Sequence, residues 1–189
     1  MLSRQSVITH ATLLAIAGAT WWLAESLSID EEGLKSAERG PVDYYSEHVR
    51  RIEYGQDGKP ATVLVAAKMV HYKQDDRTEM DKPVMTLNRS DGSAPWIIDS
   101  DRAVTLSGSD VVFLQGDVLI SKELKSEKPL KIITRNVKYS PPRNYAETSE
   151  DVLLYTDNDE LSGTGMQAQL EPNLVLKVLS NVRRKHEKR

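Results

Sequence analysis

The sequence contains no cysteine, a single phenylalanine and no excess of basic residues. Without cysteine the chain has neither a disulfide framework nor a thiolate metal site, and it is compatible with the cytoplasm or the periplasm. With 25 basic and 28 acidic residues, it lacks the basic field typical of nucleic-acid-binding proteins. Its 189 residues are enough for one ordinary domain with its own core and a small appendage.

Motifs for nucleotide or metal chemistry are also missing. No Gly-x-x-x-x-Gly-Lys-[Ser/Thr] sequence occurs, so the chain is not itself a P-loop ATPase. None of its four histidines has the spacing of a metal-binding pair. Asp157-Asn158-Asp159 lacks the glycine and glutamate of a calcium loop, which favours a solvated turn. We therefore expect no cofactor and no metal.

One carboxylate pair keeps an enzymatic alternative open. Asp99 and Asp101 are two residues apart on a predicted strand, as in a membrane-tethered glycan hydrolase that uses paired carboxylates. Apart from Trp96, no aromatic platform for a sugar lies nearby. A solvated strand face explains the pair better, and we predict that the chain is not an enzyme.

The one long uncharged stretch is residues 7–24, VITHATLLAIAGATWWLA. As a helix it would be about 27 Å long, slightly less than the roughly 30 Å hydrocarbon core of a bilayer. Trp21 and Trp22 end it at the position where indole rings prefer the membrane interface, and Arg4 before it favours an inside N-terminus. The pattern predicts a cytoplasmic segment at 1–6, a transmembrane helix at 7–24 and a periplasmic stalk at 25–41.

A cleaved signal peptide and a buried soluble helix are the alternatives to this anchor. A signal peptide needs a small-residue cleavage site after its apolar stretch. The only such pattern, Ala17-Gly18-Ala19, lies inside the stretch. An uncleaved anchor in the inner membrane, with the bulk of the chain in the periplasm, is the prediction.

The body of the chain has the pattern of β-strands. Residues 49–54 (VRRIEY) and the β-branched run 61–72 flank the turn-forming sequence Gly-Gln-Asp-Gly-Lys-Pro, which is typical of a hairpin. Gly58 ends its Asp-Gly pair, and we expect a positive φ there.

A repeated segment follows the hairpin. Val84, Val118, Val152 and Val182 lie in similar contexts, spaced 34, 34 and 30 residues apart, which indicates stacked strand pairs. Alternation around Val118 predicts that it faces a buried side, and the repeat predicts the same direction for the other three valines. The expected fold is all-β: a long twisted antiparallel sheet folded over itself, as a jelly roll or short solenoid, over 42–182, followed by a basic tail at 183–189.

In their order and spacing these features resemble the LptC family of lipopolysaccharide export proteins. The resemblance covers essentially the full length. It rests on the N-terminal anchor, the hairpin at 48–72, DKPVMTL at 81–87, Trp96 before DSDRA at 99–103, and LSGSDVVFLQGDVLI at 106–120. It implies a periplasmic β-jelly roll that receives lipopolysaccharide from an inner-membrane ABC transporter and passes it to a homologous bridge protein, LptA.

The resemblance also implies where these contacts lie. The first strands face the transporter, with Val49, Arg50, Arg51, Ile52, Tyr54 and Gly58 at this edge. The last strands face the bridge protein, with Leu174, Val175, Leu176, Val178 and Leu179 at that edge. An apolar trough between sheet faces would hold the acyl chains. Its predicted lining residues are Trp96, Ile98, Ala103, Val112, Leu114, Val118, Ile120, Ile133, Val152 and Leu154. A dry, closed core in an anchored scaffold that binds no lipid is the alternative.

Overall fold

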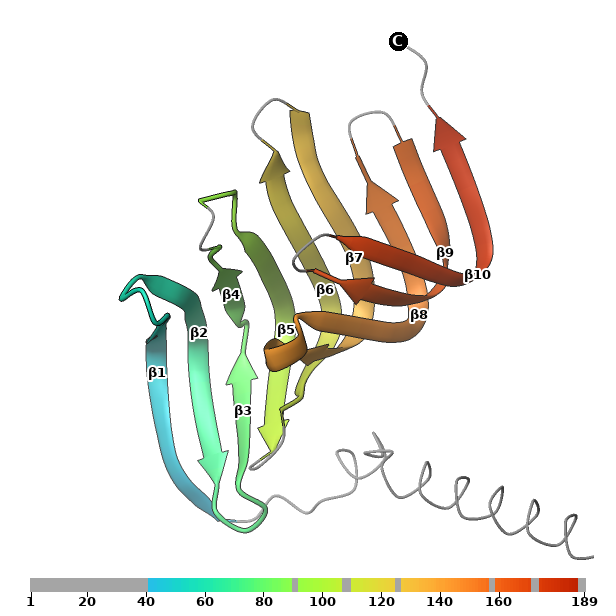
Figure 1. Cartoon of the computed structure of the whole chain (residues 1–189). Helices are drawn as coiled ribbons and strands as arrows, with labels where there is room; N and C mark the ends of the chain where they lie inside the picture. The colour runs from blue at the N-terminus through green and yellow to red at the C-terminus, as the bar shows by residue number, and fades with distance from the viewer. Residues whose placement is uncertain are drawn as a thin grey trace, which may run out of the picture. The chain divides into compact units, whose positions relative to one another are not determined.

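The computed structural model describes residues 41–89, 92–106, 110–124, 127–156, 159–170 and 174–186, and these form a ten-stranded sheet (Figure 1). The strands are β1 (Val42–Tyr54), β2 (Pro60–Tyr72), β3 (Arg77–Asp81), β4 (Val84–Leu87), β5 (Trp96–Leu106), β6 (Val112–Leu124), β7 (Glu127–Ser140), β8 (Tyr145–Tyr155), β9 (Asp159–Gln169) and β10 (Val175–His186). Paired strands run antiparallel, so the all-β antiparallel prediction is confirmed.

The strand order follows the chain. It is β1-β2-β3-β5-β6-β7-β8-β9-β10, and β4 pairs with β2 and β5 beyond the end of β3. Because β3 and β4 both lie between β2 and β5, they act as one strand interrupted at Lys82, which has a φ of 48°. The first and last strands therefore form the two edges of the sheet.

The predicted membrane span and stalk lie almost entirely outside the described residues. Within the described ranges, no helix is long and apolar enough to cross a bilayer. The one helical element found there is η1 (Pro141–Arg143), a single 3₁₀ turn. The basic tail that we expected from residue 183 begins inside β10, because this strand continues to His186.

The β1–β2 hairpin forms as expected. The backbone N–H of Gly58 donates to the carbonyl of Gly55 at 3.0 Å, and the N–H of Gly55 donates to the carbonyl of Lys59 at 2.8 Å. Gly58 has a φ of 72°, as the Asp-Gly sequence predicted. This is a three-residue loop closed by a left-handed glycine, which twists in the same sense as the flanking strands.

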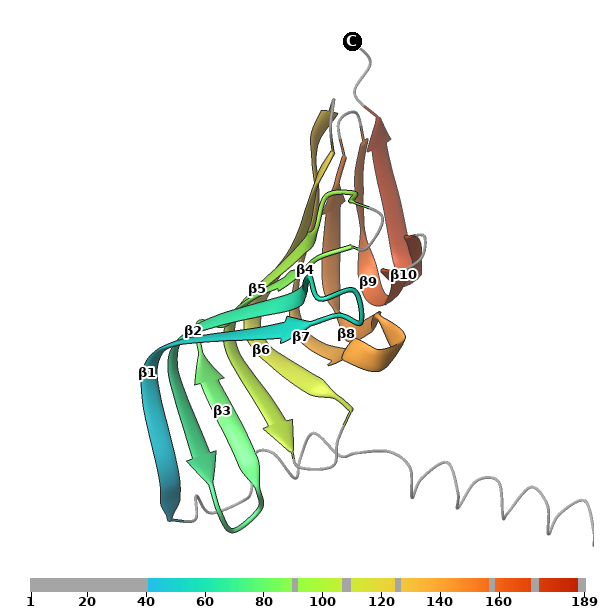
Figure 2. The same ribbon diagram turned by 60° about the vertical axis from the view of Figure 1, so that its left-hand side comes forward.

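A line of irregularities crosses the sheet near the middle of its long strands, and we call it the crease. Left-handed backbone occurs at His48, Lys82, Gly116, Asn136, Gly165 and Asn181. The pairings from β5–β6 to β9–β10 each shift register at this level. A bulged strand bends and twists more strongly, and Figure 2 shows the strands bending here, so that the sheet folds over itself.

Polar side chains bond to groups of neighbouring strands along the crease. The N–H of Asp117 donates to Asp101 Oδ2 at 2.8 Å, and the N–H of Gly116 donates to Asn136 Oδ1 at 3.2 Å. Asn136 Nδ2 in turn donates to Glu150 Oε1 at 2.8 Å. These bonds are at exposed positions, and at about 0.5–1.5 kcal/mol each they favour the bulged register by joining neighbouring strands across it.

The core lies on the inner face of the folded sheet. Its largest fully buried side chains include Trp96, Tyr139, Ile98, Ile120, Ile132, Met166 and Leu170. The alternation along β6 is confirmed, because Val112, Leu114, Val118 and Ile120 all belong to this core. Phe113 is also buried, but on the other face, with Lys138 Nζ 6.0 Å from its ring centroid.

The valine repeat predicted the side-chain direction correctly for two of its four valines. Val118 and Val152 are both in the core, as expected. The prediction is wrong for Val84, which pairs with the exposed Asp99 while Met85 takes the buried place opposite Ile98. It is also wrong for Val182, which is 55% exposed just after the shifted register of β10. A shift of one residue inverts the face of a strand, so a repeat interrupted by bulges does not preserve direction.

Candidate functional site

An apolar cavity of about 510 Å³ opens on the inner face, between the first strands and the η1 turn. Its wall comes from β1 to β4, the end of β5, the start of β6, and the segment around η1. The lining residues are Tyr44, Val49, Arg51, Glu53, Ala61, Thr62, Leu64, Met69, Thr78, Met80, Met85, Leu87, Asn88, Thr105, Val112, Tyr139, Pro141 and Asn144. This volume lies within the usual range of ligand pockets, roughly 300–1,000 Å³.

The floor of the cavity is aliphatic and rich in methionine. Met80, Met85 and Leu87 are buried, and Leu64 and Met69 pack partly buried against the core. Unbranched methionine side chains adapt their shape to an irregular apolar partner. The floor is therefore suited to a flexible hydrocarbon rather than to a rigid polar molecule.

The rim of the cavity is polar and held by specific contacts. The ring of Tyr44 stacks on His71 with the centroids 4.7 Å apart. His71 is positioned by Thr78 Oγ1 at 3.1 Å and by Asp76 Oδ1 at 3.3 Å. On the same edge strand, Arg51 Nη2 and Glu53 Oε1 form an ion pair at 2.8 Å between largely exposed side chains. An apolar floor with a polar rim suits an amphiphilic ligand.

The η1 turn forms the far wall. Pro141 and Pro142 restrict its backbone, and Asn144 closes it in the left-handed conformation, with its N–H donating to the carbonyl of Pro141 at 3.1 Å. The carbonyl of Asn144 accepts from the N–H of Leu170 at 2.8 Å, which ties the turn to the end of β9. Pro141, the first residue of the double proline, thus forms part of the wall of the cavity.

The lining residues predicted from the sequence lie mostly elsewhere. Val112 lines the cavity. The closed core takes Trp96, Ile98, Ala103, Leu114, Val118, Ile120 and Val152, and Leu154 packs against it. Ile133 must be corrected: it is 43% exposed on the outer face, because Ile132 occupies the inner position. The inner face is sealed around β5 to β9 and open beside β1 and β2.

Sequence reasoning missed the cavity floor in β2, β3 and β4. In the structure Pro83, Met85 and Leu87 are buried while Val84 and Thr86 are only half-buried. The valine repeat predicted the opposite direction, with Val84 on the buried face. Alternation by itself contained nothing to show that this part of the inner face stays open.

The predicted partner segments do lie at the two edges of the sheet. At the first edge β1 exposes Tyr45 and Tyr54, and β10 exposes Val175 and Leu179 at the other. Within the described residues, β1 pairs only with β2, and β10 pairs only with β9. Each edge therefore has one row of backbone donors and acceptors facing away from the sheet.

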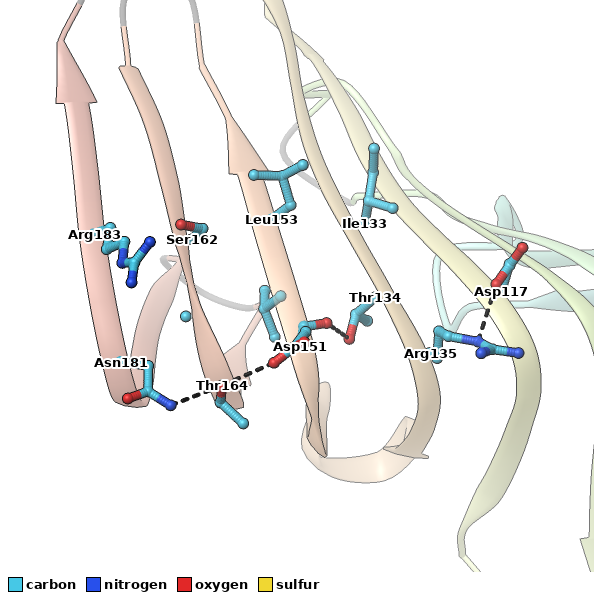
Figure 3. A pocket seen from close by; sticks show the side chains of 12 residues that line it. Asp117, Ile133, Thr134, Arg135, Asp151, Leu153, Ser162, Thr164, Asn181 and Arg183 are labelled. Atoms are coloured by element: carbon cyan, nitrogen blue, oxygen red, sulfur yellow. Dashed lines mark hydrogen bonds and ion pairs between the residues drawn. The ribbon is translucent and has the colours of Figure 1, made fainter.

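A shallow groove follows the crease on the outer face (Figure 3). Its polar side chains bond to one another: Arg135 Nε lies 3.1 Å from Asp117 Oδ1, and Thr164 Oγ1 donates to Asp151 Oδ1 at 2.8 Å. The predicted carboxylate pair is exposed, with Asp101 already accepting from the Asp117 N–H. In the described part of the chain, no cluster of three or more histidine or carboxylate side chains has the geometry to hold a metal.

Two side chains, Tyr145 and Asp159, have pKa values shifted from their ordinary ones. Burial raises the pKa of Tyr145, and the hydrogen bond that its hydroxyl donates to Glu147 Oε2 at 3.1 Å raises it further. Hydrogen bonds from Arg184 and His186 lower the pKa of Asp159. Neither Tyr145 nor Asp159 lines the cavity.

Comparisons with known proteins agree with this geometry. No curated protein matches the chain. The family model described as "Lipopolysaccharide-assembly, LptC-related" matches residues 10–187, which is nearly the whole sequence. The chain thus belongs to the LptC-related family of lipopolysaccharide-assembly proteins.

Proposed function

We propose that the chain is a single-span inner-membrane protein that holds acyl chains of lipopolysaccharide in its apolar cavity and passes the lipid from an ABC transporter to the bridge protein LptA. The observation that carries this proposal is the open aliphatic cavity beside the first edge strand, in a member of this family. The uncharged stretch at residues 7–24 supports the anchor, with the β-domain in the periplasm.

The energetic reason for such a cavity is the cost of exposing hydrocarbon to water. At about 0.8 kcal/mol per methylene, one chain of a dozen carbons in water costs roughly 10 kcal/mol. A carrier that buries these carbons nearly as well as a membrane keeps the transfer close to balance. ATP hydrolysis in the transporter can then supply the direction.

The position of the cavity supports access from the β1 edge. β1 contributes Tyr44, Val49, Arg51 and Glu53 to its wall, and this is the edge that the family resemblance assigns to the transporter. A lipid arriving there meets the cavity without crossing the sealed core. The opposite edge, β10, is left for the bridge protein by addition of a strand.

A second candidate is a scaffold that joins its partners without binding lipid. Its support is the sealed core: Trp96, Ile120 and Val152 are each at most 3% exposed, so most of the interior has no room for an acyl chain. In this case the cavity would be a packing defect beside β1. The two candidates differ in whether lipid reaches the cavity floor in cells.

In-cell photo-crosslinking separates the two functions. A photoreactive residue at Leu64 points to the cavity, and the matched control is Val65, the next residue on β2, which is 44% exposed on the other face. The carrier predicts lipopolysaccharide adducts at Leu64 and none at Val65. No adduct at either position, in cells that still transport the lipid, would favour the scaffold. A third site at Leu114 tests whether the sealed core opens during transport.

A further inference from the structure

The basic residues near the C-terminus belong to the sheet. Arg183, Arg184, Lys185 and His186 continue β10 and pair with Ser162, Leu161, Glu160 and Asp159 of β9. A solvated tail has no need of such pairing. Lysine and arginine have no strong preference for strands, so tertiary contacts hold this segment extended.

Asp159 provides those contacts. Its Oδ2 accepts from Arg184 Nη2 at 2.9 Å and its Oδ1 from Arg184 Nε at 3.1 Å. His186 Nδ1 lies 2.7 Å from the same Oδ1. One carboxylate thus fixes two alternate residues of β10, and a two-bond arginine–carboxylate contact restricts orientation as well as distance.

The other two basic residues have the opposite orientation. Successive side chains of a strand point to opposite faces, so Arg183 and Lys185 project away from Asp159. Both are exposed, and Arg183 borders the outer groove seen in Figure 3. The strand therefore presents two exposed positive charges, Arg183 opposite Ser162 and Lys185 opposite Glu160, beside an edge with no further strand in the described part of the chain.

β10 consists of two chemically different halves. Its first half, Val175 to Leu179, is apolar except for Lys177, and its second half, from Arg183, is basic. The left-handed residue Asn181, with a φ of 53°, and a register shift separate them. A strand that adds to this edge meets apolar side chains over one half and positive charges over the other.

We propose that the basic half of β10 selects its docking partner by charge, so that this edge takes a strand that is apolar opposite residues 175–179 and acidic opposite residues 183–185. The inference rests on the proposed docking at β10 and adds the chemistry of the partner. Side chains opposite each other on neighbouring strands lie close enough for opposite charges to attract and like charges to repel. Because Asp159 already holds this half extended, docking loses little conformational entropy here.

Charged side chains on an edge strand can also serve only to prevent aggregation. In that role Arg183 and Lys185 disfavour every added strand, because their charges would have to lose water on pairing, and even an acidic strand does not bind. Charge selection predicts that an acidic strand binds and that the preference reverses when the charges are reversed. The two roles therefore differ in whether an acidic strand binds at this edge.

The test uses the full-length chain in detergent and two synthetic twelve-residue peptides. The peptides share an apolar half of alternating isoleucine and threonine, and their other half carries either glutamates or lysines. We expect the wild type to bind the glutamate peptide about tenfold more tightly, with a preference that falls as salt is raised.

R183E/K185E should prefer the lysine peptide, and R183E alone should lose most of the preference for the glutamate peptide. K73E/K131E is the matched control and should behave as wild type, because both lysines are exposed and lie neither on β10 nor on the β1 edge.

Equal binding of both peptides, or a preference that survives R183E/K185E, would overturn the inference. K185E places a carboxylate opposite Glu160, and this repulsion disfavours the pairing of β10 with β9. R183E avoids the repulsion, because Arg183 lies opposite Ser162. The binding of LptA to wild type is then compared with its binding to R183E/K185E. If the peptide preference reverses but LptA does not bind wild type, the charge selection stands and the proposed docking fails. If LptA binds wild type and R183E/K185E equally, docking stands and charge selection is wrong.

Discussion

Replacing Gly116, a half-buried residue in the middle of β6, with alanine should destabilise the fold more than the same change at Gly58 in the hairpin turn. Gly116 lies at the crease with a φ of 79°, in the left-handed region. A Cβ there would lie 2.8 Å from Asp101 Cβ and still closer to Asp101 Oδ2. Asp101 would have to move, and the hydrogen bond that it accepts from the Asp117 N–H at 2.8 Å would be lost or weakened.

The magnitude follows from two contributions. A non-glycine residue in the left-handed region costs about 1–2 kcal/mol, and the loss of the hydrogen bond adds about 0.5–1.5 kcal/mol. We expect G116A to lower the free energy of unfolding by about 2–3 kcal/mol. The matched control is G58A, because Gly58 has a similar φ of 72° and nothing within 4 Å of the added carbon. G58A should lower the free energy of unfolding only by the cost of a left-handed non-glycine residue, about 1–2 kcal/mol.

The assay is urea unfolding of the full-length chain in detergent. Trp21 and Trp22 are replaced with phenylalanine in every variant, so that the buried Trp96 is the only tryptophan that reports on the core. Equal destabilisation by G116A and G58A would refute the reasoning, because the contact with Asp101 would then cost nothing. In a D101G background the difference between the two variants should disappear.

Three further predictions test the core, the contact between Asp159 and β10, and the docking edge. Ile120→Ala, at a fully buried site, should lower the free energy of unfolding by about 2–5 kcal/mol in the same urea assay. Asp159 has a folded-state pKa below its unfolded value, so its stabilisation is present above the unfolded pKa and is lost as the pH falls through the folded one. The stability difference between wild type and D159N, measured by urea unfolding from pH 7 downward, should therefore persist to about pH 4, the ordinary pKa of an aspartate, and shrink as the pH falls further. V175P and V178P remove backbone N–H groups that point in opposite directions, one towards β9 and one away from the sheet. The variant that loses the N–H pointing away from the sheet should keep its fold by circular dichroism. It should fail to co-purify with LptA, because that N–H is needed to pair with an added strand.

The crease explains why sequence reasoning found the strands but not the cavity. Alternation along β6 correctly assigned Val118 and Ile120 to the buried face, because period two is a local property of a strand. Ile133 was misplaced because two isoleucines stand side by side in β7, and only the structure shows that Ile132 rather than Ile133 faces the core. Bulges change the direction of side chains without changing composition, so a repeat of valines does not reveal them.

The sequence alone determined the all-β class and the β1–β2 hairpin with Gly58 in the left-handed region. These properties depend on turn chemistry and on alternation within a few residues. The first and last strands as edges of the sheet were implied by the family resemblance. Only the tertiary structure decided which inner-face residues are sealed and which line an open cavity, because the crease brings together residues far apart in the chain. It also decided that Asp159 holds the basic end of β10, because the pairing of β9 with β10 sets this contact.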